Sequence, residues 1–272
     1  NVIDFTDAVS LYLSRMVEKE RNIFKKIFIK AELKRISKYE NIAEKFDALF
    51  ICSEIDRKFL IDKGIKQDIR ILNNGIDTDY FVSEKNDYDI KRIIFTGNMP
   101  YYANSDAAIY FVKEILPIIL LKDPEVKFYI VGQRPPLSVK QLVSKNVIVT
   151  GYVKDIKEEY LKSSVNVAPM RFGAGTLNKV LESIALGVPV VATSISMLGL
   201  QKELAKFVFI ADTPTQFANT VLEIINNPSI RNELMVEGKA IISKTLSWNN
   251  IVSDFELFLN TKLKEINKNI NV

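Results

Sequence analysis

The sequence of 272 residues contains no histidine. Serine-hydrolase triads with a histidine base and metal sites with histidine ligands are therefore excluded. The single cysteine, Cys52, lies in a short apolar run, which excludes a disulfide framework and is typical of a packed thiol in a reducing compartment. No apolar run is long enough to cross a membrane, and residues 1–10 lack the basic and apolar regions of a signal peptide. These absences predict a cytoplasmic protein.

The composition is that of an ordinary globular protein, with 47% hydrophobic and 26% charged residues. The chain is long enough for one large or two modest domains. Its 37 basic and 33 acidic residues give a net charge of +4, and the lysines are spread among acidic neighbours instead of forming a basic stripe with aromatics. We therefore expect no nucleic-acid partner. Anionic ligands remain open, and so does peripheral association with a membrane surface, such as the inner face of the cytoplasmic membrane.

Residues 171–200 are the most informative stretch. Apolar side chains recur there at i, i+3, i+4, i+7 and i+8, the spacing of an amphipathic helix: Leu177, Val180, Leu181, Ile184 and Ala185. The pattern predicts a helix over 176–186. Thr176 is the expected cap of its first turn, Gly187 its left-handed end, and Pro189 prevents its continuation.

The outward face of this helix is predicted to carry Asn178, Lys179 and Glu182. Lys179 falls in the first turn, where the helix dipole is already positive, and Gly173 and Gly175 leave the approach to the free amides open. Amides, dipole and lysine together favour a phosphate. Glu182, about 4.5 Å further along the axis, offers two acceptor oxygens that suit vicinal sugar hydroxyls. The alternative is a solvated face with a Lys179–Glu182 pair worth a few tenths of a kcal/mol.

The polar patch at residues 83–89 is predicted to link two parts of the chain. Before it we expect a strand near residues 2–5, two helices in 11–44, a strand at 47–52, a helix at 55–63, a strand at 69–72 and a turn at 73–75. After it, short apolar strands alternate with helices, which predicts an α/β fold with a doubly wound parallel sheet. The expected strands are 92–96, 126–131, 147–150, 165–168, 188–192 and 207–210. The expected helices are 105–121, 138–144, 156–161, 176–186 and 213–226, followed by 229–244 and 248–264.

Ligands of such sheets bind beyond the carboxyl ends of the strands. Gly97, Gly132 and Gly151 end three successive predicted strands, and Gly173 with Gly175 follows the fourth. Each glycine permits a close backbone approach to a ligand in the crevice. We also expect phosphate-facing amides at Gly97–Asn98 and at the helix start near Asn104. The glycine loop is neither a dinucleotide fingerprint nor a P-loop, because the third glycine and a following Gly-Lys-Ser/Thr are absent.

These residues resemble the retaining glycosyltransferases of the GT-B fold (glycosyltransferase family 4-like, glycosyl transferases group 1), and the similarity covers nearly the whole chain. The segments that carry it are IIFTGNMPYYANSDAAIYFVKEILPII, FYIVGQRPP, VIVTGYVKD, GAGTLNKVLESIALGVPVVAT and, between the two domains, ILNNGIDTDYF. The resemblance implies a partial acceptor-side Rossmann-like domain with its linker in residues 1–82. It implies a nucleotide-sugar-binding Rossmann-like domain in 83–245 and a C-terminal helix in 246–272 that packs back towards the first domain.

The resemblance also implies residue roles. Glu182 would bind the ribose hydroxyls, and Lys179 with the amides of Thr176 and Leu177 would bind the diphosphate, so that Lys179 and Glu182 are the expected catalytic residues. Gly97 would lie on the phosphate side. The loops of Arg134 and Tyr152–Val153 would contact the nucleotide base. The whole expected nucleotide-sugar site comprises Gly97, Asn98, Arg134, Tyr152, Val153, Gly173, Gly175, Thr176, Leu177, Asn178, Lys179 and Glu182.

The implied reaction transfers a sugar, with retention, from a UDP- or GDP-sugar to a hydroxyl of a glycan or lipid-linked acceptor. No metal and no cofactor are expected, because the nucleotide sugar is itself the substrate. Asp77-Thr78-Asp79 spells a D-x-D motif, but its place after the interdomain turn indicates a loop or capping role.

Two departures from the family pattern keep alternatives open. The family has two glutamates with seven residues between them; the second is Glu182, but the first position is Ala174. The part before the turn at residues 73–75 is much shorter than a family N-terminal domain, and we expect that domain to be truncated. VIDFTDAVS resembles an internal segment in which Asp4, Asp7 and Ser10 face the interdomain cleft. The alternatives are a non-catalytic nucleotide-binding partner or scaffold of GT-B type and, less well supported, a nucleotide-sugar epimerase.

Overall fold

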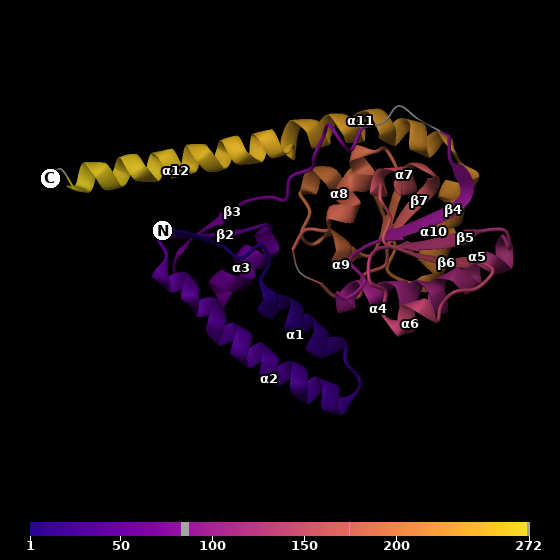
Figure 1. Cartoon of the computed structure of the whole chain (residues 1–272), viewed down its shortest axis with the longest axis horizontal. Helices are drawn as coiled ribbons and strands as arrows, with labels where there is room; N and C mark the ends of the chain where they lie inside the picture. Colours follow the sequence, from indigo (N-terminus) through magenta and orange to yellow (C-terminus); the bar gives the residue numbers. More distant parts are fainter. Residues whose placement is uncertain (83–86, 174, 271–272) are drawn as a thin grey trace.

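The computed structural model describes residues 1–82, 87–173 and 175–270. The first part of the chain forms a parallel three-stranded sheet in the order β1-β2-β3 (Figure 1). Its strands are β1 (Val2–Asp4), β2 (Ala48–Ile51) and β3 (Asp68–Ile71). Its helices are α1 (Val9–Lys19), α2 (Ile23–Glu40), the 3₁₀ turn η1 (Asn41–Lys45) and α3 (Glu54–Asp62). β2 is buried along its whole length, as its continuous apolar sequence requires.

The second part contains a parallel sheet of six strands in the order β6-β5-β4-β7-β8-β9. Numbered within this sheet, the order is 3-2-1-4-5-6, that of the doubly wound nucleotide-binding fold. The predicted fold class is therefore confirmed. The strands are β4 (Asp89–Thr96), β5 (Lys127–Val131), β6 (Val147–Gly151), β7 (Ser163–Ala168), β8 (Val190–Ala192) and β9 (Val208–Ile210).

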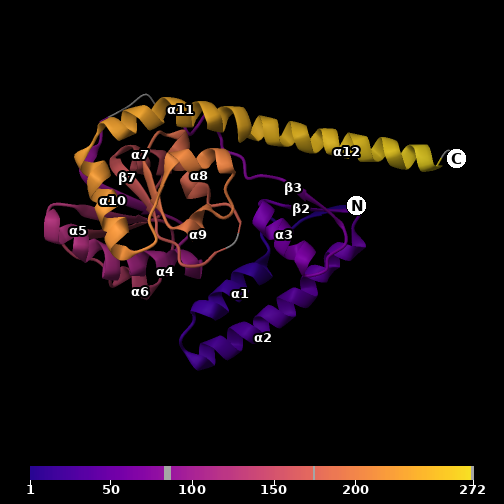
Figure 2. The same ribbon diagram turned by 180° about the vertical axis from the view of Figure 1, so that it is seen from behind.

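Helices cover both faces of this sheet (Figures 1 and 2). They are α4 (Tyr102–Tyr110), α5 (Leu116–Lys122), α6 (Leu137–Lys140), α7 (Ile156–Leu161), α8 (Asn178–Ala185), α9 (Ser194–Met197), η3 (Lys202–Phe207), α10 (Pro214–Asn226) and α11 (Ser229–Thr245). α6 is shorter than the helix expected at 138–144. β7 is buried at every position, with apolar clusters on both sides of the sheet, as its central position requires.

The single helix expected at residues 105–121 is interrupted in the structure. A π-helical turn, η2 (Phe111–Ile115), separates α4 from α5, and Pro117 lies at the start of α5. Proline lacks the N–H that an uninterrupted α-helix needs, and its ring collides with the carbonyl four residues earlier. A wider turn before the proline relieves that collision. The chain therefore stays helical from Tyr102 to Lys122, with one π turn that the prediction did not include.

The C-terminal helix α12 (Trp248–Ile270) leaves the second sheet and runs across to the first (Figures 1 and 2). Phe50 of β2 meets Phe255 and Phe258 edge to face, with ring centroids 5.0 and 5.2 Å apart. The guanidinium of Arg70 lies 5.0 Å from the centroid of the Phe258 ring. This aromatic cluster holds α12 against the first sheet.

Candidate functional site

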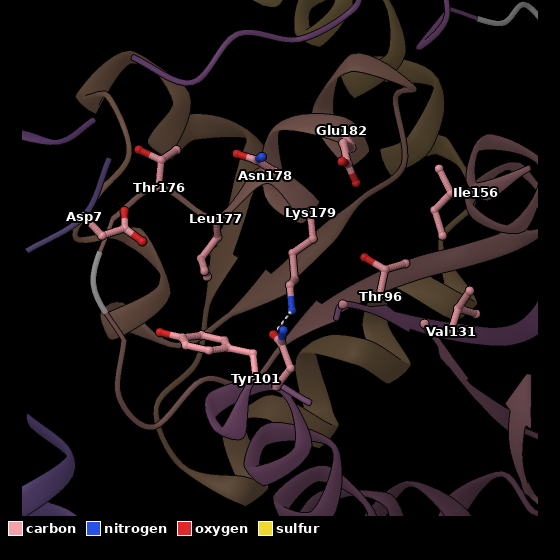
Figure 3. Close-up of a pocket in the computed structure, with 13 residues that line it drawn as sticks. Asp7, Thr96, Tyr101, Val131, Ile156, Thr176, Leu177, Asn178, Lys179 and Glu182 are labelled. Carbon is pink, nitrogen blue, oxygen red and sulfur yellow. Dashed lines mark hydrogen bonds between the residues drawn. The ribbon is translucent and has the colours of Figure 1, made fainter. Parts of the chain in front are cut away.

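A cavity of about 380 Å³ opens where the strand order of the large sheet reverses, between β4 and β7 (Figure 3). It lies beyond the carboxyl ends of the strands, the usual ligand position in doubly wound sheets. Thr96 and Gly97 line it from the end of β4, Val131 and Gly132 from the end of β5, and α8 from the opposite wall. The crevice is thus formed by two of the predicted strand-end glycines, Gly97 and Gly132, and the predicted helix, whereas Gly151 does not line it.

Glycines allow the ends of β4 and β5 to approach each other closely. A Cβ atom at Gly132 would lie 1.7 Å from the carbonyl oxygen of Gly97, and one at Gly97 would lie 2.8 Å from the Asn104 side chain. Neither position can hold a side chain without moving its neighbour. This close packing brings Asn104, from α4, to the floor of the cavity.

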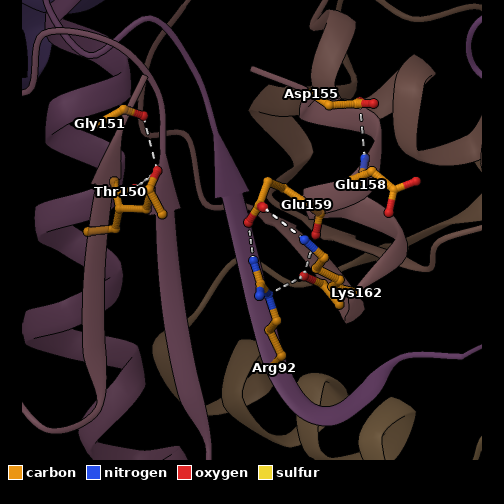
Figure 4. Close-up of polar contacts among 9 residues, drawn as sticks. Arg92, Thr150, Gly151, Asp155, Glu158, Glu159 and Lys162 are labelled. Carbon is orange, nitrogen blue, oxygen red and sulfur yellow. Dashed lines mark hydrogen bonds and ion pairs between the residues drawn. The ribbon is translucent and has the colours of Figure 1, made fainter. Parts of the chain in front are cut away.

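α7 forms the outer wall of the cavity and contributes Ile156. Its cap is Asp155, whose carboxylate accepts from the backbone N–H of Lys157 and Glu158 at 3.0 and 3.3 Å (Figure 4). Further along the helix, Glu159 pairs with Arg92 of β4 (Figure 4). The cap and the ion pair fix α7 against the sheet.

α8 begins at Asn178, two residues later than expected, and its N-cap residue Leu177 makes no side-chain capping bond. The prediction that Thr176 caps this helix is wrong. Its hydroxyl donates instead to the carbonyls of Gly199 at 2.8 Å and Cys52 at 3.3 Å, so it joins the glycine loop to the end of β2. The Val180 N–H donates to the Leu177 carbonyl at 2.9 Å. Because no side chain caps the helix, the amides before Val180 can face an anion.

Lys179 points into the crevice, so the prediction that it lies on an outward face is wrong. The side chain is 7% exposed. Its Nζ donates to Asn104 Oδ1 at 2.7 Å (dashed line in Figure 3). It also lies 4.0 Å from the centroid of the Phe95 ring. Burial lowers the pKa of Lys179 to about 7, against the opposing charge of Glu182. Of the polar face of α8, Asn178 stays exposed and Glu182 is half-buried, whereas Lys179 is buried against the sheet. The helical period does not show which part of a polar face will be covered.

Glu182 is half-buried on the same wall of the cavity. Its carboxylate accepts a 2.8 Å hydrogen bond from the hydroxyl of Tyr160, which is also 2.6 Å from Thr96 Oγ1. Burial raises the pKa of Glu182, while the Tyr160 bond and the Lys179 charge lower it. Among the described residues Lys179 and Glu182 form no ion pair, and Lys179 is buried, so the alternative of a solvated salt bridge is wrong.

The expected site residues divide into two groups. Those that line the cavity are Gly97, Thr176, Leu177, Asn178, Lys179 and Glu182. Those that do not are Asn98, Arg134, Tyr152, Val153, Gly173 and Gly175. Ala174 lies outside the described residues. The binding role of every member remains a prediction.

The residues outside the cavity have other contacts in this structure. The Asn98 carbonyl accepts from the Asn104 amide at 3.0 Å, and the Gly175 amide donates to Asp56 at 2.9 Å. Arg134 is exposed, Tyr152 is 77% exposed, and Val153 packs on a small apolar cluster that contains Tyr160 and Leu186. Arg134, Tyr152 and Val153, which were expected at the nucleotide base, therefore do not line the cavity, although Gly132 at the start of the Arg134 loop does.

Sequence reasoning missed several cavity residues: Thr96, Tyr101, Asn104 as a side chain, Val131 and Ile156. Asn104 was expected only to offer a backbone amide. Its place seven residues after Gly97 could have indicated it, because a residue within the first turn of the helix after β4 faces the same crevice. No signal in the sequence indicates that Ile156 reaches the cavity from α7.

The D-x-D motif has a local structural role. Asp77 Oδ1 accepts from the backbone N–H of Asp79 at 3.1 Å and of Tyr80 at 3.0 Å, the capping arrangement expected from its position.

Within residues 1–82, 87–173 and 175–270, no cluster of three or more Asp, Glu or Cys residues is arranged to hold a metal ion. The described helices include none long and apolar enough to span a bilayer.

Superposition on solved structures identifies the fold. The chain superposes on HepE of Anabaena in complex with UDP and glucose with a TM-score of 0.71, at 14% identity over 95% of this chain and 71% of that one. The TM-score is 0.68 for Staphylococcus aureus TarM in complex with fondaparinux, α-GlcNAc-glycerol and UDP, at 18% identity over 83% of this chain and 46% of that one. These likenesses define the class: the chain has the GT-B fold.

A family model described as "Glycosyl transferases group 1" matches residues 90–227, half of the chain. The chain belongs to this family. It is also 23% identical over 258 residues to an uncharacterized 44.6 kDa protein in the cps region of Klebsiella pneumoniae, over 89% of this chain and 64% of the relative. The chain thus spans less than two thirds of that relative, and about half of TarM.

Proposed function

We propose that this chain is the donor-binding part of a glycosyltransferase that moves a sugar from a UDP- or GDP-sugar to a hydroxyl of a glycan or lipid-linked acceptor. The observation that carries the proposal is the convergence, in one cavity, of the uncapped start of α8, Lys179 and Glu182. The amides and the helix dipole attract a diphosphate, and Lys179 adds a cation. Glu182 accepts hydrogen bonds from ribose hydroxyls.

The site suits departure of a nucleoside diphosphate. The bond between the anomeric carbon and the phosphate oxygen breaks, and a bond to the acceptor oxygen forms on the same face of the sugar. The acceptor proton moves to a departing phosphate oxygen. Charge grows on the diphosphate in this step, and Lys179 and the preoriented α8 amides stabilise it there. We propose transfer with retention and without a metal ion.

The descriptions of similar proteins support a nucleotide-sugar donor as the ligand. HepE and TarM are described in complex with UDP, and the Klebsiella relative is encoded in a cps region. A glycan acceptor in polysaccharide synthesis is therefore our preferred acceptor class. The competing hypothesis, a non-catalytic nucleotide-binding partner, retains the cavity but lacks turnover.

Transfer assays distinguish the two hypotheses. The full-length protein is incubated with labelled UDP- and GDP-sugars and a glycan or lipid extract, with Lys179→Met as the matched inactive variant. We expect labelled product or released nucleotide with the wild type only. Nucleotide binding without transfer or donor hydrolysis across the whole panel would favour the partner hypothesis.

A second part of the proposal is peripheral membrane association through α2. Four neighbouring apolar side chains at the start of this helix are 59–80% exposed: Ile23, Phe24, Ile27 and Phe28. Lys25, Lys26 and Lys30 lie between and beside them, and Lys25 and Lys30 are exposed. This end of α2 lies at the edge of the molecule, at the turn with α1 (Figures 1 and 2). Exposed aromatics among lysines suit an anionic lipid surface.

Vesicle sedimentation tests the membrane proposal. Replacing Phe24 and Phe28 with alanine should reduce binding to phosphatidylglycerol vesicles about tenfold or more, because each buried phenylalanine contributes about 1.5–3 kcal/mol. The control is Leu121→Ala with Leu137→Ala, which removes two equally exposed apolar side chains from the second domain. Equal binding by the two double variants, or no difference between neutral and anionic vesicles, would contradict it.

A further inference from the structure

Asp7 enters the cavity from the first domain, beyond the start of α8 (Figure 3). Asp7 and Glu182 are the two carboxylates among the described residues that line the cavity. Along its wall, Glu182 comes first, then Lys179, then the start of the helix near Thr176, and finally Asp7 (Figure 3). The wall thus has a carboxylate at each end and a cationic region between them.

A nucleoside diphosphate sugar has the same order of parts: a ribose, a diphosphate and a transferred sugar. The carboxylate of Asp7 repels phosphate and accepts hydrogen bonds from neutral donors such as hydroxyls. We propose that Asp7 binds the transferred sugar of the donor by accepting hydrogen bonds from its hydroxyl groups. This inference rests on the proposed function, because it requires the nucleotide to lie along α8.

The backbone before Asp7 is strained. Thr6 has φ +60°, a conformation that β-branched residues rarely adopt. Two hydrogen bonds impose it: the Asp7 N–H donates to the Phe5 carbonyl at 2.6 Å, and the Cys52 N–H donates to the Thr6 carbonyl at 2.9 Å. Strain of this kind is maintained by surrounding contacts and occurs at ligand sites. Here its result is the direction of the Asp7 side chain.

The Asp7 carboxylate fits a space left by Gly175. A Cβ atom at Gly175, where φ is +69°, would lie 1.7 Å from Asp7 Oδ1. The fully buried Asp56 accepts from the Ala8 N–H at 3.1 Å and from the Gly175 N–H at 2.9 Å. The Asp56 carboxylate therefore holds Ala8, the residue after Asp7, at a fixed distance from Gly175.

Asp7 has acceptor capacity left for a ligand. Among the described residues its one side-chain partner is the thiol of Cys52 at 3.2 Å, and a thiol is a weak donor. Burial raises the pKa of Asp7, and the Cys52 bond acts in the opposite direction. Hydroxyl donors from a bound sugar would replace the solvation that burial removes.

Calorimetry on the full-length protein tests the inference by comparing UDP and GDP with their sugar conjugates. The variants are Asp7→Asn, Asp7→Ala and the control Asp62→Asn, which removes an equal charge from the exposed surface of α3. In both Asp7 variants we expect affinity for the nucleotide sugar to fall about tenfold or more, the usual effect of losing a hydrogen bond to a charged group. Affinity for the free nucleotide should stay within about twofold, which also shows that the site is folded.

Each alternative result has a distinct meaning. If the Asp7 variants weaken the free nucleotide and the nucleotide sugar equally, Asp7 supports the loop and the inference is wrong. If neither affinity changes, Asp7 does not contact the donor and the inference is again wrong. A wild type that binds no nucleotide or nucleotide sugar would overturn the proposed function and, with it, the role of Asp7.

Discussion

Replacing Lys179 with methionine should reduce the rate of sugar transfer about 10²–10³-fold, the usual effect of removing one preoriented donor from developing charge. Methionine has a similar length and suits the contact with the Phe95 ring, so the α8 packing should survive. The measurement is kcat and kcat/KM for the nucleotide sugar, with thermal unfolding as a check on folding. Lys127→Met, at the first residue of β5, is the control for loss of one positive charge from the same part of the chain.

The pH dependence of nucleotide binding identifies the charge on Lys179. Its pKa in the folded protein is lowered to about 7, and a bound diphosphate favours the charged form and raises that pKa. Near pH 8 the wild type should therefore take up a proton when it binds UDP, and its affinity should fall as the pH rises above 7. Calorimetry in buffers of different ionisation enthalpy measures the uptake. A Lys179→Met variant with the same uptake would contradict this assignment.

The same pKa shift predicts the pH dependence of stability. Between pH 7 and the ordinary lysine pKa of 10.5, the folded protein binds fewer protons at Lys179 than the unfolded chain does. The contribution of Lys179 to the free energy of unfolding therefore rises with pH across this window, and below pH 7 the full cost of the buried charge remains. Lys179→Met should remove this dependence.

Replacing Glu182 with alanine should weaken nucleotide binding about 10–100-fold, because the ribose loses a charged hydrogen-bond acceptor. The loss should depend on the ribose hydroxyls. With 2′,3′-dideoxy-UDP the wild type and Glu182→Ala should bind alike, since the ligand then lacks the groups that the carboxylate accepts from. Calorimetry measures the affinity of the wild type and of Glu182→Ala for both ligands. Glu125→Ala, on the exposed surface, is the matched control.

Two outcomes would contradict the assignment of Glu182. Unchanged UDP affinity in Glu182→Ala would mean that the ribose lies elsewhere. An equal loss with UDP and with dideoxy-UDP would mean that Glu182 acts through Tyr160, its 2.8 Å partner, by supporting the wall of the cavity. Retained thermal stability of Glu182→Ala would exclude general unfolding as the cause.

Much of the fold could be predicted because its signals are local. Alternating apolar strands and amphipathic helices indicated a doubly wound sheet, and the observed strand order is the one typical of that fold. Gly187 ends α8 with φ +68°, as predicted. Glycines at the ends of β4 and β5 correctly indicated the edge of the sheet at which the cavity lies, because a close backbone approach requires glycine.

The errors have a common cause: they concern partners that are distant in the sequence. Thr176 has the residue type of a helix cap, yet its hydroxyl bonds to Cys52 and Gly199. Lys179 has the period of an outward face, yet that face packs on Phe95 and Asn104. Helical periodicity separates two faces of a helix but does not say what lies against the second one.

By itself the sequence determined the fold class, the edge of the large sheet at which the cavity lies, and the presence of Lys179 and Glu182 on α8. Spacing, glycine placement and residue type are local properties. Only the tertiary structure decided what surrounds those charges. It buried Lys179 and thereby lowered its pKa, gave Glu182 a tyrosine partner, and placed Asp7 against a glycine loop more than 160 residues away in sequence. Electrostatic environment depends on what packs around a group, and that is set when the chain folds.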